Sequence, residues 1–196
     1  MQTPDNDIKM RILLAAKKLF AEQGFDGTSV RQICEAAGAN VALVSYYFGG
    51  KENMFGELFQ VFFPNDLIAS IDQNMEPLEG VKLAIREITL FRHNDPELIR
   101  IIQQEIITNS ARIQKIREYV MPMWFLLRRW VEEGRNQGLF HYRSLDTAFM
   151  SVVGALLFHR QSEYWRAITD EGEGTAEQLA EDLTSFILGG LGASEA

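Results

Sequence analysis

Hydrogen-bonding side chains gather between residues 31 and 45, in a stretch that is otherwise small and apolar. The guanidinium of Arg31 has the fork of donors that matches O6 and N7 of guanine, and Asn40 and Ser45 can exchange hydrogen bonds with base edges. Val41 and Ala42 are small enough to allow a close approach to base pairs and to contact the methyl group of thymine. These residue types therefore indicate a surface that reads the edges of base pairs.

A second group of side chains could hold the phosphates beside such base pairs. Tyr46 and Tyr47 can donate hydroxyl hydrogen bonds to phosphate oxygens, and Lys51 adds a positive charge. Thr28 and Lys51 stand where helices are expected to begin, and helix N-termini favour anions. As alternatives, Thr28 and Asn40 could serve only as helix caps, and either tyrosine could fill a small core. The expected DNA-binding residues are Thr28, Arg31, Asn40, Val41, Ala42, Ser45, Tyr46, Tyr47 and Lys51.

Three short helices are expected to position these side chains within the first fifty residues. The first has an apolar stripe of helical period from Ile8 to Phe20 and ends at Gly24, which can adopt the left-handed conformation. Thr28 is a natural N-cap for the second helix, and Gly38 closes that helix. Two short helices joined by a tight turn fit a helix-turn-helix, which inserts its second helix into the major groove of DNA.

The third helix is expected over residues 41–48, directly after the N-cap Asn40. Val44 and Phe48 are four residues apart and should face the core together. The opposite face then carries Val41, Ala42 and Ser45. This face would be the one presented to DNA.

Helical signals continue to the end of the chain without an alternating β pattern, so the fold is predicted to be all-α. A connecting helix over residues 51–63 stops at Pro64, which cannot continue it. Pro122 lies within a helical stretch over about 112–137, where it either kinks one helix or starts another. Other helix starts are marked by Pro77, Asp95-Pro96-Glu97, Asp146 and the capping box Thr175-x-x-Gln178.

Composition and charge narrow the possible classes of protein. The 196 residues are 46% hydrophobic, enough to bury a core. The net charge is −8, yet residues 1–51 carry six basic and five acidic side chains, so this part is the better match to a polyanion. The single cysteine, Cys34, excludes an intramolecular disulfide and is typical of a small buried hydrophobe. No membrane-length apolar run and no signal-like N-terminus occurs, so a soluble, cytoplasmic protein is expected.

Motifs for catalysis are missing from the sequence. It contains no Gly-rich phosphate loop, nucleophile elbow or HExxH helix, so neither an enzyme nor a cofactor is expected. His159 and Glu163 are four residues apart and could share a metal ion on one helix face. Because no third ligand has a suitable spacing, no metal site is predicted.

Several motifs occur together, with fixed spacing, in ILLAAKKLFAEQGFDGTSVRQICEAAGANVALVSYYFGGKENMF. They are the string A-x-x-LF-x-x-x-G-F-x-x-T-S-V-x-x-I, an A-G turn and the segment Y-x-F-x-x-K-E. Over residues 8 to about 59 the chain thus resembles the DNA-binding head of the TetR family of transcriptional regulators. The resemblance implies a helix-turn-helix head over residues 1–50 and a ligand-binding and dimerisation body over residues 51–196, which starts with the connecting helix. Leu43 and Ser45 depart from the family pattern, where threonine and tyrosine are frequent, so no operator sequence is carried over.

The body is rich in aromatic and methionine side chains, most of which must form its core. The resemblance implies an inducer pocket among its helices, and an adaptable apolar body suits one. Candidate pocket residues are Phe62, Phe91, Trp124, Arg128 and His159. For His159, a packed or interface position is the alternative.

The last two helices are expected to pair two copies of the chain. Gly154 and Ala155 allow a second helix to approach closely, and the helix after Thr175 has a strong apolar stripe, so a two-fold four-helix interface fits. The resemblance implies the same homodimer. Packing of a monomer core is the alternative.

We therefore expect a homodimeric repressor that binds a palindromic double-stranded DNA operator and is released by an unknown small-molecule inducer. Two other classes remain as alternatives. One is a small-molecule-binding or protein-interaction helical module without DNA selectivity. The other is a small helical enzyme that depends on His159 or Glu163.

Overall fold

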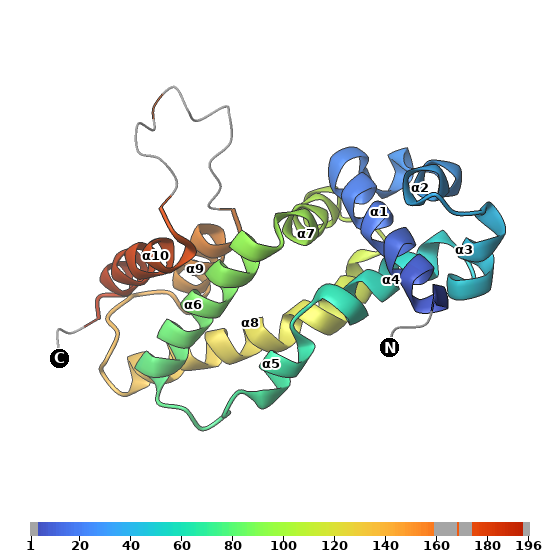
Figure 1. Ribbon diagram of the computed structural model, residues 1–196. Helices are drawn as coiled ribbons and strands as arrows, with labels where there is room; N and C mark the ends of the chain where they lie inside the picture. The colour runs from blue at the N-terminus through green and yellow to red at the C-terminus, as the bar shows by residue number, and fades with distance from the viewer. Residues whose placement is uncertain (1–3, 159–167, 169–173, 194–196) are drawn as a thin grey trace. The chain divides into compact units, whose positions relative to one another are not determined.

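The computed structural model describes residues 4–158, 168 and 174–193, and every regular element in these residues is an α-helix (Figure 1). This confirms the predicted all-α fold. No helix in the described residues is long and apolar enough to cross a membrane. The helices are α1 (Pro4–Gly27), α2 (Val30–Ala37), α3 (Val41–Phe48), α4 (Lys51–Phe62), α5 (Asn65–Ser70), α6 (Pro77–Asn94), α7 (Pro96–Thr108), α8 (Ile113–Asn136), α9 (Leu145–Phe158) and α10 (Ala176–Gly190).

The chain divides into two compact units. The first unit comprises Met1–Ala69 and Pro96–Val120, and the second comprises Ser70–Asp95 and Met121–Ala196. The first unit thus holds α1 to α4, α5 except its last residue, α7 and the first turns of α8. Helix α8 continues through Pro122, so the observed structure is one helix and not a new start at the proline. The division between the units falls beside this proline.

Local signals set the helix ends near the N-terminus. Gly24 has φ +74° and interrupts α1 where the sequence predicts a break, and Gly38 closes α2 at φ +60°. The N-cap of α2 is Ser29, which forms a reciprocal capping box with Gln32. The prediction that Thr28 caps α2 is wrong, because its Oγ1 donates to the carbonyl of Gly24 at 2.8 Å and closes the preceding turn.

Aromatic rings form the centre of the first unit. The rings of Phe20, Phe25 and Phe55 lie within 5.8 Å of one another, measured between centroids. Phe59 extends the cluster from α4 and stacks on Tyr119 of α8 at 5.8 Å. Helix α7 packs on α1. Helices α1 and α4 are therefore held by residues that lie far along the chain as well as by each other.

In the second unit, α6 packs against α9 and α10 (Figure 1). A Cβ at Gly80 of α6 would lie 2.3 Å from the buried ring of Trp130, so only glycine fits this contact. Helix α10 begins at the predicted capping box of Thr175 and Gln178.

The start of α9 differs from the prediction. Asp146 lies in the first turn of α9, and the helix starts one residue earlier, at Leu145. The hydroxyl of Ser144 accepts a hydrogen bond from the amide of Thr147 at 3.3 Å and caps the helix instead. Both Asp146 and Ser144 are good capping types, so sequence preference does not separate them.

Candidate nucleic-acid interface

Helix α3 has the two faces that the sequence predicts. Val44 and Phe48 are buried in the first unit. Val41, Ala42 and Ser45 are exposed on the other side. The helix is thus fixed by one face and offers a surface of small side chains on the other, which allows its backbone to come close to a ligand.

Asn40, the residue just before α3, and Arg31 are both exposed. Oδ1 of Asn40 accepts a hydrogen bond from the amide of Ala42 at 2.9 Å, which confirms its predicted capping role. This bond engages only Oδ1, so the side-chain amide can still donate to a ligand. Arg31 lies in the first turn of α2.

Thr28 does not reach the surface. Its side chain is only 2% exposed, and its hydroxyl is engaged with the carbonyl oxygens of Leu19 and Gly24. The adjacent Ser29 is exposed at the N-terminus of α2. Sequence reasoning missed Ser29, although the capping-box spacing Ser29-x-x-Gln32 was available as a signal.

The two tyrosines of α3 differ in exposure. Tyr46 is 75% exposed, whereas Tyr47 is half-buried and contacts the ring of Phe48 edge-on at 6.2 Å. The two tyrosine rings meet edge-on at 5.0 Å. The sequence predicts either a phosphate contact or a place in the core for these tyrosines. The exposed Tyr46 therefore has the geometry of a surface contact, whereas Tyr47 is partly packed and partly exposed.

Lys51 stands at the start of α4, as predicted. Its Nζ lies 4.0 Å from the ring centroid of Phe25, so the aromatic ring holds the ammonium group. The N-cap of α4 is Gly50, and no side chain caps the helix there. The first amides of α4 and the nearby ammonium group together favour an anion such as phosphate.

Two other basic side chains near the N-terminus form ion pairs within the first unit. Lys9 pairs with Glu57 at 2.5 Å, and Lys17 lies 3.9 Å from a carboxylate oxygen of Glu97. These lysines join α1 to α4 and α7, so their charges are partly neutralised by the protein itself. Burial raises the pKa of the Cys34 thiol, which keeps it neutral, in agreement with its predicted role as a small hydrophobe.

The candidate pocket residues are not gathered at one described cavity. Phe62 belongs to the first unit, where Nζ of Lys17 lies 4.3 Å from its ring centroid. Phe91, Trp124 and Arg128 belong to the second unit. Arg128 pairs with carboxylates of α8 and α9, so its charge is compensated. The predicted fifth residue, His159, lies outside the described residues, as does Glu163.

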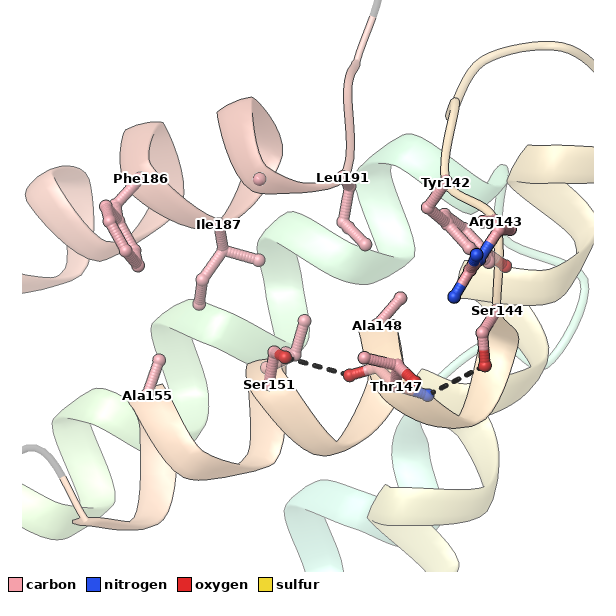
Figure 2. A pocket seen from close by; sticks show the side chains of 12 residues that line it. Tyr142, Arg143, Ser144, Thr147, Ala148, Ser151, Ala155, Phe186, Ile187 and Leu191 are labelled. Carbon is pink, nitrogen blue, oxygen red and sulfur yellow. Dashed lines mark hydrogen bonds between the residues drawn. The ribbon is translucent and has the colours of Figure 1, made fainter.

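A groove of about 370 Å³ lies between α9 and α10 in the second unit (Figure 2). Phe186 and Ile187 of α10 face Ala155 and Ser151 of α9 across it, and Tyr142 and Arg143 close one end (Figure 2). None of the predicted pocket residues lines this groove. The small side chains of α9 make the groove, since larger ones would fill it.

The arrangement of α2 and α3 defines the class of protein. Gly38 in the left-handed conformation joins two short helices, the first fixed by buried side chains and the second exposing one face. This is the geometry of a helix-turn-helix DNA-binding protein. Residues 12–58 match the sequence profile of "Bacterial regulatory proteins, tetR family".

Known proteins resemble the chain well beyond this segment. The probable HTH-type transcriptional regulator YttP of Bacillus subtilis is 32% identical over 135 residues, which is 66% of this chain and 65% of that protein. The HTH-type transcriptional repressor NicS of Pseudomonas putida is 27% identical over 163 residues, 78% of this chain and 76% of that protein. The crystal structure of HlyIIR, a hemolysin II transcriptional regulator, superposes with a TM-score of 0.76 at 28% identity, covering 97% of this chain and 99% of that one. The chain therefore belongs to the TetR family of transcriptional regulators.

Proposed function

We propose that the protein is a homodimeric repressor that binds a palindromic operator and releases it when a small molecule binds the second unit. The observation that carries the proposal is the exposed face of α3, where Val41, Ala42 and Ser45 project from a helix held by two buried side chains. Repression is supported by the likeness to NicS, which is named a repressor. Because operators are chromosomal, the protein is proposed to act in the cytoplasm.

The proposed contacts divide into base reading and phosphate binding. Arg31 and Ser45 would hydrogen-bond to base edges, with Asn40 at the start of the helix, while Val41 and Ala42 would contact thymine methyl groups. Tyr46, Tyr47 and Lys51 would hold phosphates, and Ser29 takes the position first expected for Thr28. Phosphate contacts position the protein but carry little sequence information.

The proposed dimer uses the exposed surface of α9 and α10 around the groove between them. Phe186 is 73% exposed, and Met150 of α9 is also exposed. A Cβ at Gly154 would meet no atom within 4 Å, so the surface there is open to a second helix. Two-fold pairing of this face would give two heads related by symmetry, and a palindrome is read when two such heads lie one DNA turn apart, at about 34–36 Å.

A sedimentation experiment tests the dimer. Phe186→Glu is expected to give monomers, because a charge would be buried in the interface. Ile107→Glu is the matched control, since Ile107 is equally exposed but lies on α7 in the first unit. A Phe186→Glu protein that still sediments as a dimer would overturn the proposed interface.

Selection from a random pool of DNA duplexes tests operator binding. A palindrome should be enriched, and its affinity should fall steeply with salt because counterions are released. Arg31→Ala should cost about 1–3 kcal/mol and relax the preference at one base pair, whereas Lys51→Ala should weaken all sequences alike. Lys82→Ala, which removes a partly exposed lysine of α6 paired with Glu79, is the control for loss of charge. Failure to enrich any duplex would favour the ligand-binding module without DNA selectivity.

A further inference from the structure

The guanidinium of Arg92 is buried in the second unit and has no counter-charge among the residues that the structure describes. The residue lies in the last turn of α6 and is only 7% exposed. Its Nη1 donates a hydrogen bond to the carbonyl oxygen of Leu156 in α9. Its Nη2 is also buried and has no hydrogen-bond partner. Among the described residues, no carboxylate forms an ion pair with it.

A second unused polar group lies one helical turn away. Thr89 is fully buried on α6, and its Oγ1 has no hydrogen-bond partner. Residues three apart on a helix lie on the same face, with Cβ atoms roughly 5–6 Å apart. The hydroxyl of Thr89 and Nη2 of Arg92 are therefore two unused donors on one face of α6.

This arrangement is unfavourable unless an anion binds there. An arginine side chain does not lose its proton under ordinary conditions, so it cannot relieve burial by becoming neutral. Burial lowers the pKa of Arg92, because the charged guanidinium is held away from water. A carbonyl oxygen satisfies one N–H but supplies no net charge. A buried charge that lacks its partner lowers the stability of the folded protein, whereas replacement of the charged side chain by an apolar one is tolerated.

Among the described residues, the helix turns next to the two donors carry buried hydrocarbon side chains. Ile85 lies one turn before Thr89 on α6, and Val152, Leu156 and Leu157 lie on α9 around the carbonyl that accepts from Arg92. A ligand that fits such surroundings has one anionic group and an apolar remainder. A carboxylate can accept one hydrogen bond from a guanidinium and another from a hydroxyl, so it uses both donors.

We propose that Arg92 and Thr89 form an anion subsite that binds the carboxylate of an apolar carboxylic acid. This inference rests on the proposed function, because it supplies the chemical class of the small molecule that the second unit binds. The bound carboxylate would compensate the guanidinium and give the hydroxyl of Thr89 an acceptor. Binding energy would then come from a charge-assisted hydrogen bond and from burial of the apolar chain.

Calorimetric titration of the full chain with saturated fatty acids of six to sixteen carbons tests the subsite directly, with the primary alcohols of the same length as neutral probes. Carboxylates are expected to bind and the alcohols are not. Arg92→Met should weaken carboxylate binding about 10- to 100-fold, and Thr89→Val about 2- to 10-fold, as loss of a charged and of a neutral hydrogen bond predicts. Arg86→Met is the matched control, because this exposed arginine of α6 pairs with Glu87.

The melting temperature of the unliganded protein separates a ligand subsite from a structural role. Arg92→Met should leave Tm unchanged or raise it, since it removes an uncompensated charge. A fall of more than about 5 °C would show that the guanidinium has a structural role beyond its hydrogen bond to the carbonyl of Leu156, and would overturn the proposal. Equal binding of acids and alcohols, or no binding of any acid, would also overturn it.

Release of operator DNA is measured in a separate assay, so the anion subsite and the release of DNA by a ligand can be refuted independently. If fatty acids bind through Arg92 but leave the protein–DNA complex intact, the subsite stands and ligand release by this route is refuted. If DNA is selected but no carboxylate binds, the regulator stands and the subsite is refuted.

Discussion

Replacement of Arg112 by alanine is expected to destabilise the first unit strongly. Arg112 precedes α8, and its Nε lies 3.1 Å from Oε2 of Glu105 on α7. Glu105 is only 4% exposed, and it also accepts a hydrogen bond from the hydroxyl of Ser110. The guanidinium lies 4.1 Å from the ring centroid of Phe25 and reaches Asp26, so it joins α7 to the end of α1.

The size of the effect follows from the burial of each partner. Loss of Arg112 leaves the carboxylate of Glu105 buried with one hydroxyl donor, and breaking such a pair costs about 3–5 kcal/mol. The pair with Asp26 contributes at most about 1 kcal/mol, because the Asp26 side chain is exposed to water. Asp26→Ala is therefore the matched control. The double variant Glu105→Gln and Arg112→Met should recover most of the loss, since no charge is then left buried.

The assay must report on the first unit. Trp124 and Trp130 belong to the second unit, and Trp165 lies outside the described residues, so indole fluorescence is not a specific probe of the first unit. Urea unfolding by far-UV circular dichroism, with hydrogen exchange of peptides covering residues 96–120, measures the relevant free energy. Equal losses for Arg112→Ala and Asp26→Ala, or a coupling energy between Glu105 and Arg112 below about 1 kcal/mol, would refute the reasoning.

Three further predictions concern packing, capping and the thiol. Gly80→Ala should lower the free energy of unfolding by at least about 1–3 kcal/mol in urea titrations, because the new Cβ would overlap the ring of Trp130. Ser29→Ala should lower the free energy of unfolding by about 1 kcal/mol, because the α2 cap is lost. Thr28→Val should lower it by a similar amount, because the hydrogen bonds of the hydroxyl are lost. A variant whose chemical denaturation midpoint does not change would contradict the role given to that residue. Burial raises the pKa of the Cys34 thiol, so the folded protein holds this proton more tightly than the unfolded chain does. The free energy of unfolding should therefore fall as the pH rises above the ordinary thiol pKa. Cys34→Ala should remove that part of the pH dependence.

The sequence predicts the recognition region well because its signals are local. The cap at Asn40, the left-handed Gly38 and the four-residue spacing of Val44 and Phe48 each depend on a few neighbouring residues. The error at Thr28 arose where two adjacent residues could both cap a helix. The tertiary environment decided between them, since the Thr28 hydroxyl lies within reach of carbonyl oxygens of α1.

Features that depend on contacts between residues far apart in the chain could not be predicted from the sequence. Nothing in the local pattern connects Arg112 to Phe25, or shows that α7 packs on α1. The pocket residues were chosen by type, and the chain distributes them between two units. Arg92 was missed for the same reason, because its significance lies in the absence of a partner within the described residues and not in its sequence neighbours.

On α3, the residues that hold the fold and those that face outward are separate sets. Val44 and Phe48 are buried, whereas Val41, Ala42 and Ser45 are exposed. Exposed substitutions of this kind change stability by no more than about 0.5 kcal/mol. Duplicated copies of such a gene can therefore diverge at these three positions and acquire new target sites while the scaffold stays intact.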